Sequence, residues 1–185
     1  MLVIDSICRF GIEIEFACEL PDITISEITG ISLSRDSNTW WNIGADETAS
    51  DERGDGFELR SPIFSVFPEE ELELHLNSIS KIGWITPTCG LHFHFSGAGF
   101  NYLNFLDKSD FFFLSKELLN LGKPNPERSQ FCQPCDSLHL HKNVALREIS
   151  DSHWECRTFN STFNSSLILN NFEKMLGVLY GFNTK

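Results

Sequence analysis

The chain has 185 residues, 41% of them hydrophobic, so it is long enough to bury one sizeable core but short for two independent domains. Its 26 acidic residues outnumber 14 basic ones and give a formal charge of −12, which argues against a nucleic-acid groove. Because no apolar run approaches the roughly 18 residues of a membrane span, and Asp5 and Arg9 interrupt the region where a signal peptide is apolar, we expect a single cytoplasmic domain over residues 1–185 with no membrane partner.

The first predicted elements are three strands. Residues Cys8–Cys18 alternate strictly between apolar and mostly polar positions, which predicts a strand with one buried face. A second strand is expected at Thr39–Gly44. A third is expected at Phe57–Phe64, broken by Pro62, which removes a ladder donor and predicts an end or an edge there. The acidic stretch between them, Ala45–Gly56, is predicted to be a loop.

Helices and strands then follow one another. Pro68, followed by acidic residues and by apolar residues at helical spacing, predicts an amphipathic helix that ends at Gly83. The alternation of Cys89–Ser96 predicts a fourth strand. Ser109 is expected to cap a second helix, which ends at Gly122.

The C-terminal part is predicted to complete the sheet and to cover it. Prolines keep the chain irregular before a short helix expected around His141–Glu148. A last strand is predicted at His153–Phe159, and the apolar spacing from Ser165 onward predicts a helix that packs on the core. Strands interleaved with helices in a mainly antiparallel pattern predict an α+β fold, one sheet with helices on one face.

Six cysteines are spread along the chain, at Cys8, Cys18, Cys89, Cys132, Cys135 and Cys156. Because no export signal is visible and most of them lie in predicted strands, we expect reduced thiols that pack as small hydrophobic side chains. Cys132 and Cys135 together with His139 and His141 also offer zinc ligands. Their spacing differs from that of common zinc fingers, whose two halves are separated by a longer loop, so zinc stays an alternative.

Four predicted strands each carry two ionisable side chains two residues apart, an arrangement that places both on the same side of a strand. The pairs are Glu13/Glu15, Glu58/Arg60, His92/His94 and Glu155/Arg157. The apolar residues between them need a core behind the sheet, so the charged pairs face a cleft or solvent. An ordinary solvated face is the simpler explanation for any one pair, but such faces usually include lysine, which is absent from all eight positions.

These residue types together indicate a bound cation. Two glutamates two residues apart repel each other unless a cation lies between them. Carboxylate oxygens with a single imidazole favour Mg²⁺ or Mn²⁺ over zinc, and arginine is a bidentate clamp for phosphate or carboxylate. The sequence therefore predicts a divalent-metal and phosphate site on the polar face.

Five segments, in order, resemble motifs of the amidoligase family, relatives of glutamine synthetase and gamma-glutamylcysteine ligase. They are FGIEIEF at Phe10–Phe16, WNIGAD at 41–46 leading to FELRSPI at Phe57–Ile63, CGLHFHF at Cys89–Phe95, PERSQFCQP at Pro126–Pro134 and ECRTFNST at Glu155–Thr162. The resemblance spans about four-fifths of the chain. It implies a glutamine synthetase-like catalytic domain that joins a carboxylate to an amine with ATP.

The resemblance also implies a role for individual residues. It implies that two or three divalent ions, Mg²⁺ or Mn²⁺, are held by Glu13, Glu15, Glu58, His92 and Glu155. His94 would touch the nucleotide phosphates, Arg157 would neutralise phosphate or hold the acceptor carboxylate, and Arg128 would face a phosphate. Asp46 resembles an acid that follows the family's tryptophan strand, although Asp51 competes for that role.

Amide formation fits these residues. A free carboxylate must be activated as an acyl phosphate, and metal ions and arginine neutralise the charge that develops in phosphoryl transfer. The substrates implied are small-molecule or peptide carboxylates and amines, whose identity the sequence leaves open. The chain is short for the family between Arg128 and Glu155, so part of the pocket is expected to be missing or to come from a second subunit of a homo-oligomer.

Two other functions stay open. A non-catalytic module of the same fold would bind nucleotide and metal without forming a product, and a metal-dependent amide hydrolase would act without ATP. A histidine pair on a strand is also typical of cupin barrels, but these usually place a glutamate a few residues later. Residues 95–99 contain none.

Overall fold

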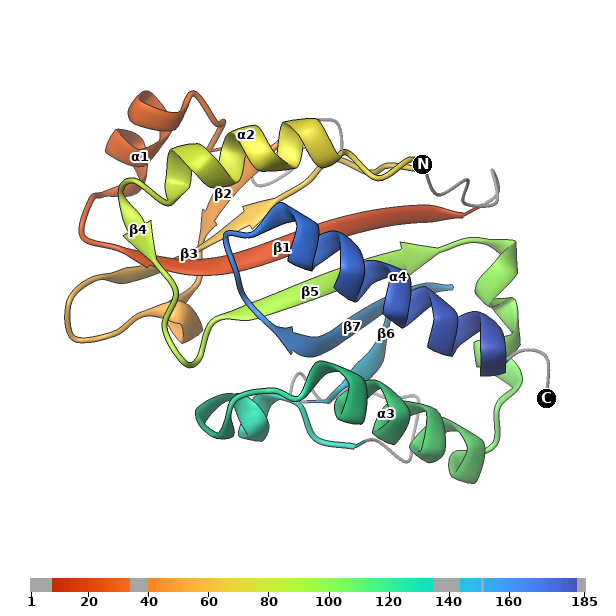
Figure 1. Ribbon diagram of the computed structural model, residues 1–185. Coiled ribbons are helices and arrows are strands. Elements are labelled where there is room, and N and C mark those ends of the chain that lie inside the picture. The colour runs from red at the N-terminus through yellow and green to blue at the C-terminus, as the bar shows by residue number, and fades with distance from the viewer. Residues whose placement is uncertain (1–7, 34–39, 135–143, 151, 183–185) are drawn as a thin grey trace.

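The computed structural model describes residues 8–33, 40–134, 144–150 and 152–182. These residues form an open seven-stranded sheet with helices packed against it (Figure 1). The strand order is β2-β3-β1-β5-β7-β6, and β4 pairs with β1 beside this path. All pairs between these strands are antiparallel, so the protein is α+β with a mainly antiparallel sheet, as the sequence predicts.

The elements have the following bounds. The strands are β1 (Arg9–Cys18), β2 (Asn42–Ala45), β3 (Asp55–Arg60), β4 (Gly83–Trp84), β5 (Gly90–Ser96), β6 (Leu146–Ser150) and β7 (His153–Asn160). The α-helices are α1 (Asp22–Thr29), α2 (Glu69–Ile79), α3 (Lys108–Gly122) and α4 (Ser165–Phe182). Short 3₁₀ helices are η1 (Glu47–Ala49), η2 (Ala98–Phe105) and η3 (Pro126–Phe131).

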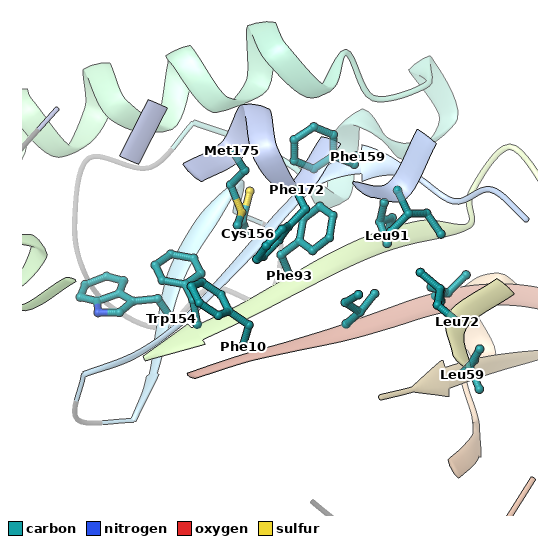
Figure 2. Close-up of a cluster of buried hydrophobic side chains, with 14 of the residues drawn as sticks. Phe10, Leu59, Leu72, Leu91, Phe93, Trp154, Cys156, Phe159, Phe172 and Met175 are labelled. Atoms are coloured by element: carbon teal, nitrogen blue, oxygen red, sulfur yellow. The ribbon is translucent and has the colours of Figure 1, made fainter. Parts of the chain in front are cut away.

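The core lies between the sheet and the helices. Figure 1 shows α4 lying across the sheet, with α2 and α3 to either side of it. Phe172 of α4 inserts among aromatic side chains of the strands, with its ring centroid 5.0 Å from that of Phe10 and 5.5 Å from that of Phe93 (Figure 2). Phe10 lies in β1 and Phe93 in β5. Because alternate residues of a strand face opposite sides, the polar residues next to them in each strand point to the other face of the sheet.

Most predicted strands are confirmed. The strands predicted at Cys8–Cys18, Cys89–Ser96 and His153–Phe159 correspond to β1, β5 and β7, and the helix predicted from Ser165 is α4. The strand predicted at Thr39–Gly44 corresponds to β2, although Thr39 lies outside the described residues. The third predicted strand corresponds to β3, which ends at Arg60, just before the break predicted at Pro62. Phe64, the last residue of the predicted strand, lies beyond β3 and pairs with Phe10 of β1 only as an isolated bridge.

The short helix predicted around His141–Glu148 is wrong over its described part. Residues from Leu146 onward form β6, while 141–143 lie outside the described residues. Arg147 faces Glu155 in the antiparallel register with β7. Pairing with a neighbouring strand thus outweighs the local sequence, which is common for short segments.

Two helix boundaries also differ from the prediction. Asp107, not Ser109, caps α3, because its carboxylate accepts a backbone N–H of the first turn at 2.9 Å. Helix α2 ends at Ile79. Gly83 lies instead in β4, where it pairs with Cys18 of β1. Helix α1 and the 3₁₀ turn η1, which lies within the predicted acidic loop, have no counterpart among the predicted elements.

Two sequence predictions concern the environment of the chain. Among the described helices, none combines the length and the apolar character needed to cross a membrane. The five cysteines that the structure describes, Cys8, Cys18, Cys89, Cys132 and Cys156, are free and buried, as predicted. Cys135 lies outside the described residues.

Candidate metal centre and adjoining pocket

The register of the central strands brings the predicted polar pairs together on one face of the sheet. Glu13 of β1 lies opposite Arg60 of β3 on one side and opposite His92 of β5 on the other. His94 of β5 in turn lies opposite Glu155 of β7. Neighbouring strands run only about 4.8 Å apart, so side chains in such a row are within reach of one another.

A β-bulge lies in β7 next to His92. Between the pairs Phe93–Cys156 and Leu91–Phe159, β5 advances by two residues and β7 by three. The extra residue allows Cys156 and Phe159 both to point into the core, where they are 0% and 1% exposed. Bulges change the direction of side chains and are frequent beside active sites.

His92 lies among three carboxylates. Its Nδ1 is 3.4 Å from Glu13 Oε2 and 3.3 Å from Glu155 Oε1, and its Nε2 is 3.1 Å from Glu15 Oε1. The imidazole is almost completely buried, as are Glu15 and Glu155. Three of the predicted glutamate ligands and the predicted histidine ligand therefore share one small volume.

His94 stands beside the same carboxylates. Its Nε2 is 3.2 Å from Glu13 Oε2 and 3.8 Å from Glu155 Oε1, while its Nδ1 is 3.2 Å from Nε2 of His153. Glu13, His94 and Glu155 each offer one ligand atom, and these three atoms all lie within 4.8 Å of one another. This group has the donor types and the spacing to hold a divalent ion.

Two buried imidazole nitrogens support that fit. Nε2 of His92 and Nε2 of His94 have no hydrogen-bond partner, although carboxylate oxygens lie 3.1 and 3.2 Å away. The groups are thus close to each other but not aligned to bond to each other. A cation between them would bind both kinds of donor, so the residues present fit a divalent metal.

Glu13, Glu15 and Glu155 form one cluster with His92 and His94. The carboxylates of this cluster are ionised at neutral pH, the form that binds a cation. Burial raises the pKa of Glu15, but His92, Arg128 and the Gly90 amide lower it by more, to about 2. Burial likewise raises the pKa of Glu13 and Glu155, yet the neighbouring histidines hold both below the usual value. For His92, burial lowers the pKa, and the adjacent carboxylates outweigh it and raise the pKa.

Two arginines contact Glu155 and one contacts Glu58. Arg147 donates a hydrogen bond from Nε to Glu155, and Arg157 Nη1 lies 3.4 Å from the other oxygen of the same carboxylate. Arg60 pairs with Glu58 on β3. Arg147 is not among the predicted site residues, because the local sequence predicts a helix at this position. The charged pair it forms with Glu155 becomes visible only in the β6–β7 register.

Arg128, the predicted phosphate-facing residue, is inside the protein. Its Nη1 donates to the carbonyl oxygen of Phe159 at 2.6 Å, and its side chain is 1% exposed. The guanidinium lies against Gly90, where a Cβ atom would come within 2.0 Å of Nη2. Nη2 is buried without a hydrogen-bond partner, and the positive charge acts on Glu15.

The two acids that competed for one ligand position are both bound by other groups. Asp46 caps η1, because its Oδ1 accepts the backbone N–H and the hydroxyl of Thr48. Asp51 forms an ion pair with Arg53 and accepts the indole N–H of Trp84, contacts that lower its pKa to about 2. The structure therefore places neither acid in the ligand group of Glu13, His94 and Glu155.

The alternative zinc site is mostly outside the described residues. Cys135, His139 and His141 all lie there. Cys132 is buried, and its thiol donates to the carbonyl oxygen of Arg157 at 3.0 Å.

A pocket of about 410 Å³ opens beside the cluster. Its wall includes Glu13 and His94 of the ligand group together with Arg9, Arg60 and His153. Its volume is in the range of small-molecule sites. The cluster and the pocket therefore form one continuous site, in which an ion and a small molecule can lie side by side.

Comparison with known proteins gives no relative to guide the assignment. No family model, no curated protein and no solved structure matches this chain. The resemblance to amidoligases consequently rests on the five sequence segments alone.

Proposed function

We propose that the protein is an ATP-dependent carboxylate–amine ligase that works with Mg²⁺ or Mn²⁺. The observation that carries this proposal is the convergence of three carboxylates and two imidazoles on one sheet face, next to arginines and an open pocket. This composition matches the needs of phosphoryl transfer to a carboxylate, which depends on positioned positive charge more than on a nucleophilic side chain. The amidoligase resemblance supports the same reaction.

In this proposal the glutamates hold the metal and the arginines hold the oxyanions. Glu13, His94 and Glu155 bind one ion, with Glu15 and His92 beside them, and the metal supplies charge neutralisation for the phosphates of ATP. Arg157 is aligned by Glu155 and offers a planar fork to a phosphoryl group or a carboxylate. ATP converts the acid into an acyl phosphate with release of ADP, and the amine then displaces phosphate to form the amide.

The reaction is tested by ADP release. Purified protein with Mg²⁺ and ATP is incubated with a panel of amino acids and small peptides, and ADP and the new amide are both quantified. We expect at least one acid and amine pair to give equal amounts of the two products, and chelation of the metal to abolish both. ADP release that no acid or amine stimulates would refute the ligase.

A metal-dependent amide hydrolase is the second candidate, and one observation favours it. The compact group of Glu13, His94 and Glu155 provides three protein ligands, the number that catalytic metal sites commonly use beside a bound water. Such an enzyme would cleave amides in the panel without ATP. A non-catalytic module would bind metal and nucleotide and form neither product.

A further inference from the structure

The pocket beside the metal cluster has two arginines in its wall, in a protein that is acidic overall. The chain carries a formal charge of −12, yet the pocket wall holds Arg9 and Arg60 against a single acid, Glu13. A concave site with this lining attracts anions locally, whatever the net charge of the molecule. Ile63, 51% exposed, adds an apolar wall.

Arg60 is held in a defined position at this pocket. Its guanidinium lies directly on Gly44 of β2, where a Cβ atom would come within 2.8 Å of both Nη1 and Nη2. Glu58 pairs with Nη2 and fixes one edge of the fork. The oxygen of Glu13 nearest to Nε is 3.9 Å away, beyond hydrogen-bond length.

This arrangement leaves Arg60 able to take a ligand. A guanidinium has five N–H donors in a planar fork, so one carboxylate partner does not use them all. In contrast, the hydroxyl of Ser61 in the same wall is used by the backbone. It accepts the N–H of Ile12 and donates to the carbonyl oxygen of Pro62, both at 2.8 Å.

We infer that this pocket binds the acid substrate and that Arg60, whose guanidinium packs against Gly44, binds the carboxylate of that substrate. This inference rests on the proposed ligase function and names the substrate as a small carboxylic acid with an apolar part. Arg60 lies opposite Glu13 in the β1–β3 register, so a carboxylate on Arg60 lies beside the proposed metal ligands. The planar fork of one arginine matches the two oxygens of a carboxylate.

Anion titration of the ¹⁵N-labelled protein tests this inference without ATP or metal. Acetate, phosphate and chloride are added in turn, and NMR follows the Arg60 Nε–H and the Gly11 amide in the pocket wall. We expect saturable shifts with acetate at millimolar concentration and only non-saturating shifts with chloride. Equal responses to acetate and chloride would overturn the inference. Saturation by phosphate alone would mean that the pocket takes phosphates and would overturn it as well.

Two glycine variants provide a matched pair. Gly44→Ala places a methyl group where the guanidinium lies, and the far end of this side chain can move without disturbing the backbone. We expect it to weaken acetate binding roughly tenfold or more, because a charge-assisted contact is displaced. Gly177→Ala on α4, where an added Cβ would meet nothing within 4 Å, should bind acetate as the parent does.

Arg60→Lys supplies a second variant, which keeps the charge but loses the fork, and it should also weaken acetate binding. Parent-like acetate affinity in both Gly44→Ala and Arg60→Lys would refute the role of Arg60. Failure of the ligase proposal is a separate result. If acetate binding depends on Arg60 but no acid causes ADP release, the carboxylate pocket is supported and the ligase function is refuted.

Discussion

Replacing Glu13 by glutamine should remove most of the stabilisation that a divalent ion gives to this protein. Glu13→Gln keeps the shape of the side chain but removes the charge that faces His92 and His94. An ion at 100 times its dissociation constant stabilises the folded state by about 2.7 kcal/mol. For 185 residues the unfolding entropy is about 0.39 kcal/mol/K, so the melting temperature of the parent should rise by about 7 °C.

Thermal unfolding with increasing Mn²⁺ measures this difference. We expect the rise to shrink to about 2 °C or less in Glu13→Gln, because a neutral amide oxygen replaces one of three close ligand atoms. Glu70→Gln, an equal charge change at an exposed position of α2, should retain the full rise. A parent without any rise, or a Glu13→Gln variant with the same rise as the parent, would show that the cluster does not bind the ion as argued.

Three further predictions address other parts of the molecule. His153→Ala should weaken Mn²⁺ binding about 10–100-fold in an EPR titration of free Mn²⁺, because it removes the group that contacts Nδ1 of His94. His153→Gln retains a hydrogen-bond acceptor and should recover part of the lost Mn²⁺ affinity. Arg157→Lys should lower ligase turnover about 10²–10³-fold at an unchanged melting temperature, since lysine keeps the charge but not the fork, and a parent-like rate of amide formation would contradict this role. Phe172→Ala should lower the free energy of unfolding in urea by about 3–5 kcal/mol because it empties the core position between the sheet and α4, whereas Leu74→Ala, at a position 64% exposed, should change it by less than about 0.5 kcal/mol.

The sequence predicts those parts of the fold in which one physical signal dominates. In β1, alternation alone places Ile12 and Ile14 on the core face and Glu13 and Glu15 on the opposite face, so both the strand and its polar face are predictable. Strand β6 lacks such a signal. It carries Arg147 on the side of the cluster but ends in two exposed residues, and it is held in place by pairing with β7.

The candidate site was predictable as a set of polar pairs but not as a geometry. Spacing shows that His92 and His94 share a face, whereas only the register shows that His94 meets Glu155 and His153. The packing of the Arg60 guanidinium against Gly44 requires that β3 pairs with β2, and these strands are separated in sequence by a loop and a 3₁₀ turn. Local patterns contain no information on such cross-strand partners.

The burial of charge at this face is hard to explain by folding alone. Glu155 is 1% exposed and is surrounded by Arg147, Arg157, His92 and His94. Taking such ions out of water costs several kcal/mol for each, and replacing a buried ion pair by apolar residues is often neutral or stabilising by about 1–4 kcal/mol. The opposite face of the sheet already supplies a large apolar core. A sheet that nevertheless keeps five ionisable groups together is therefore better explained by a ligand that binds them than by the stability they give.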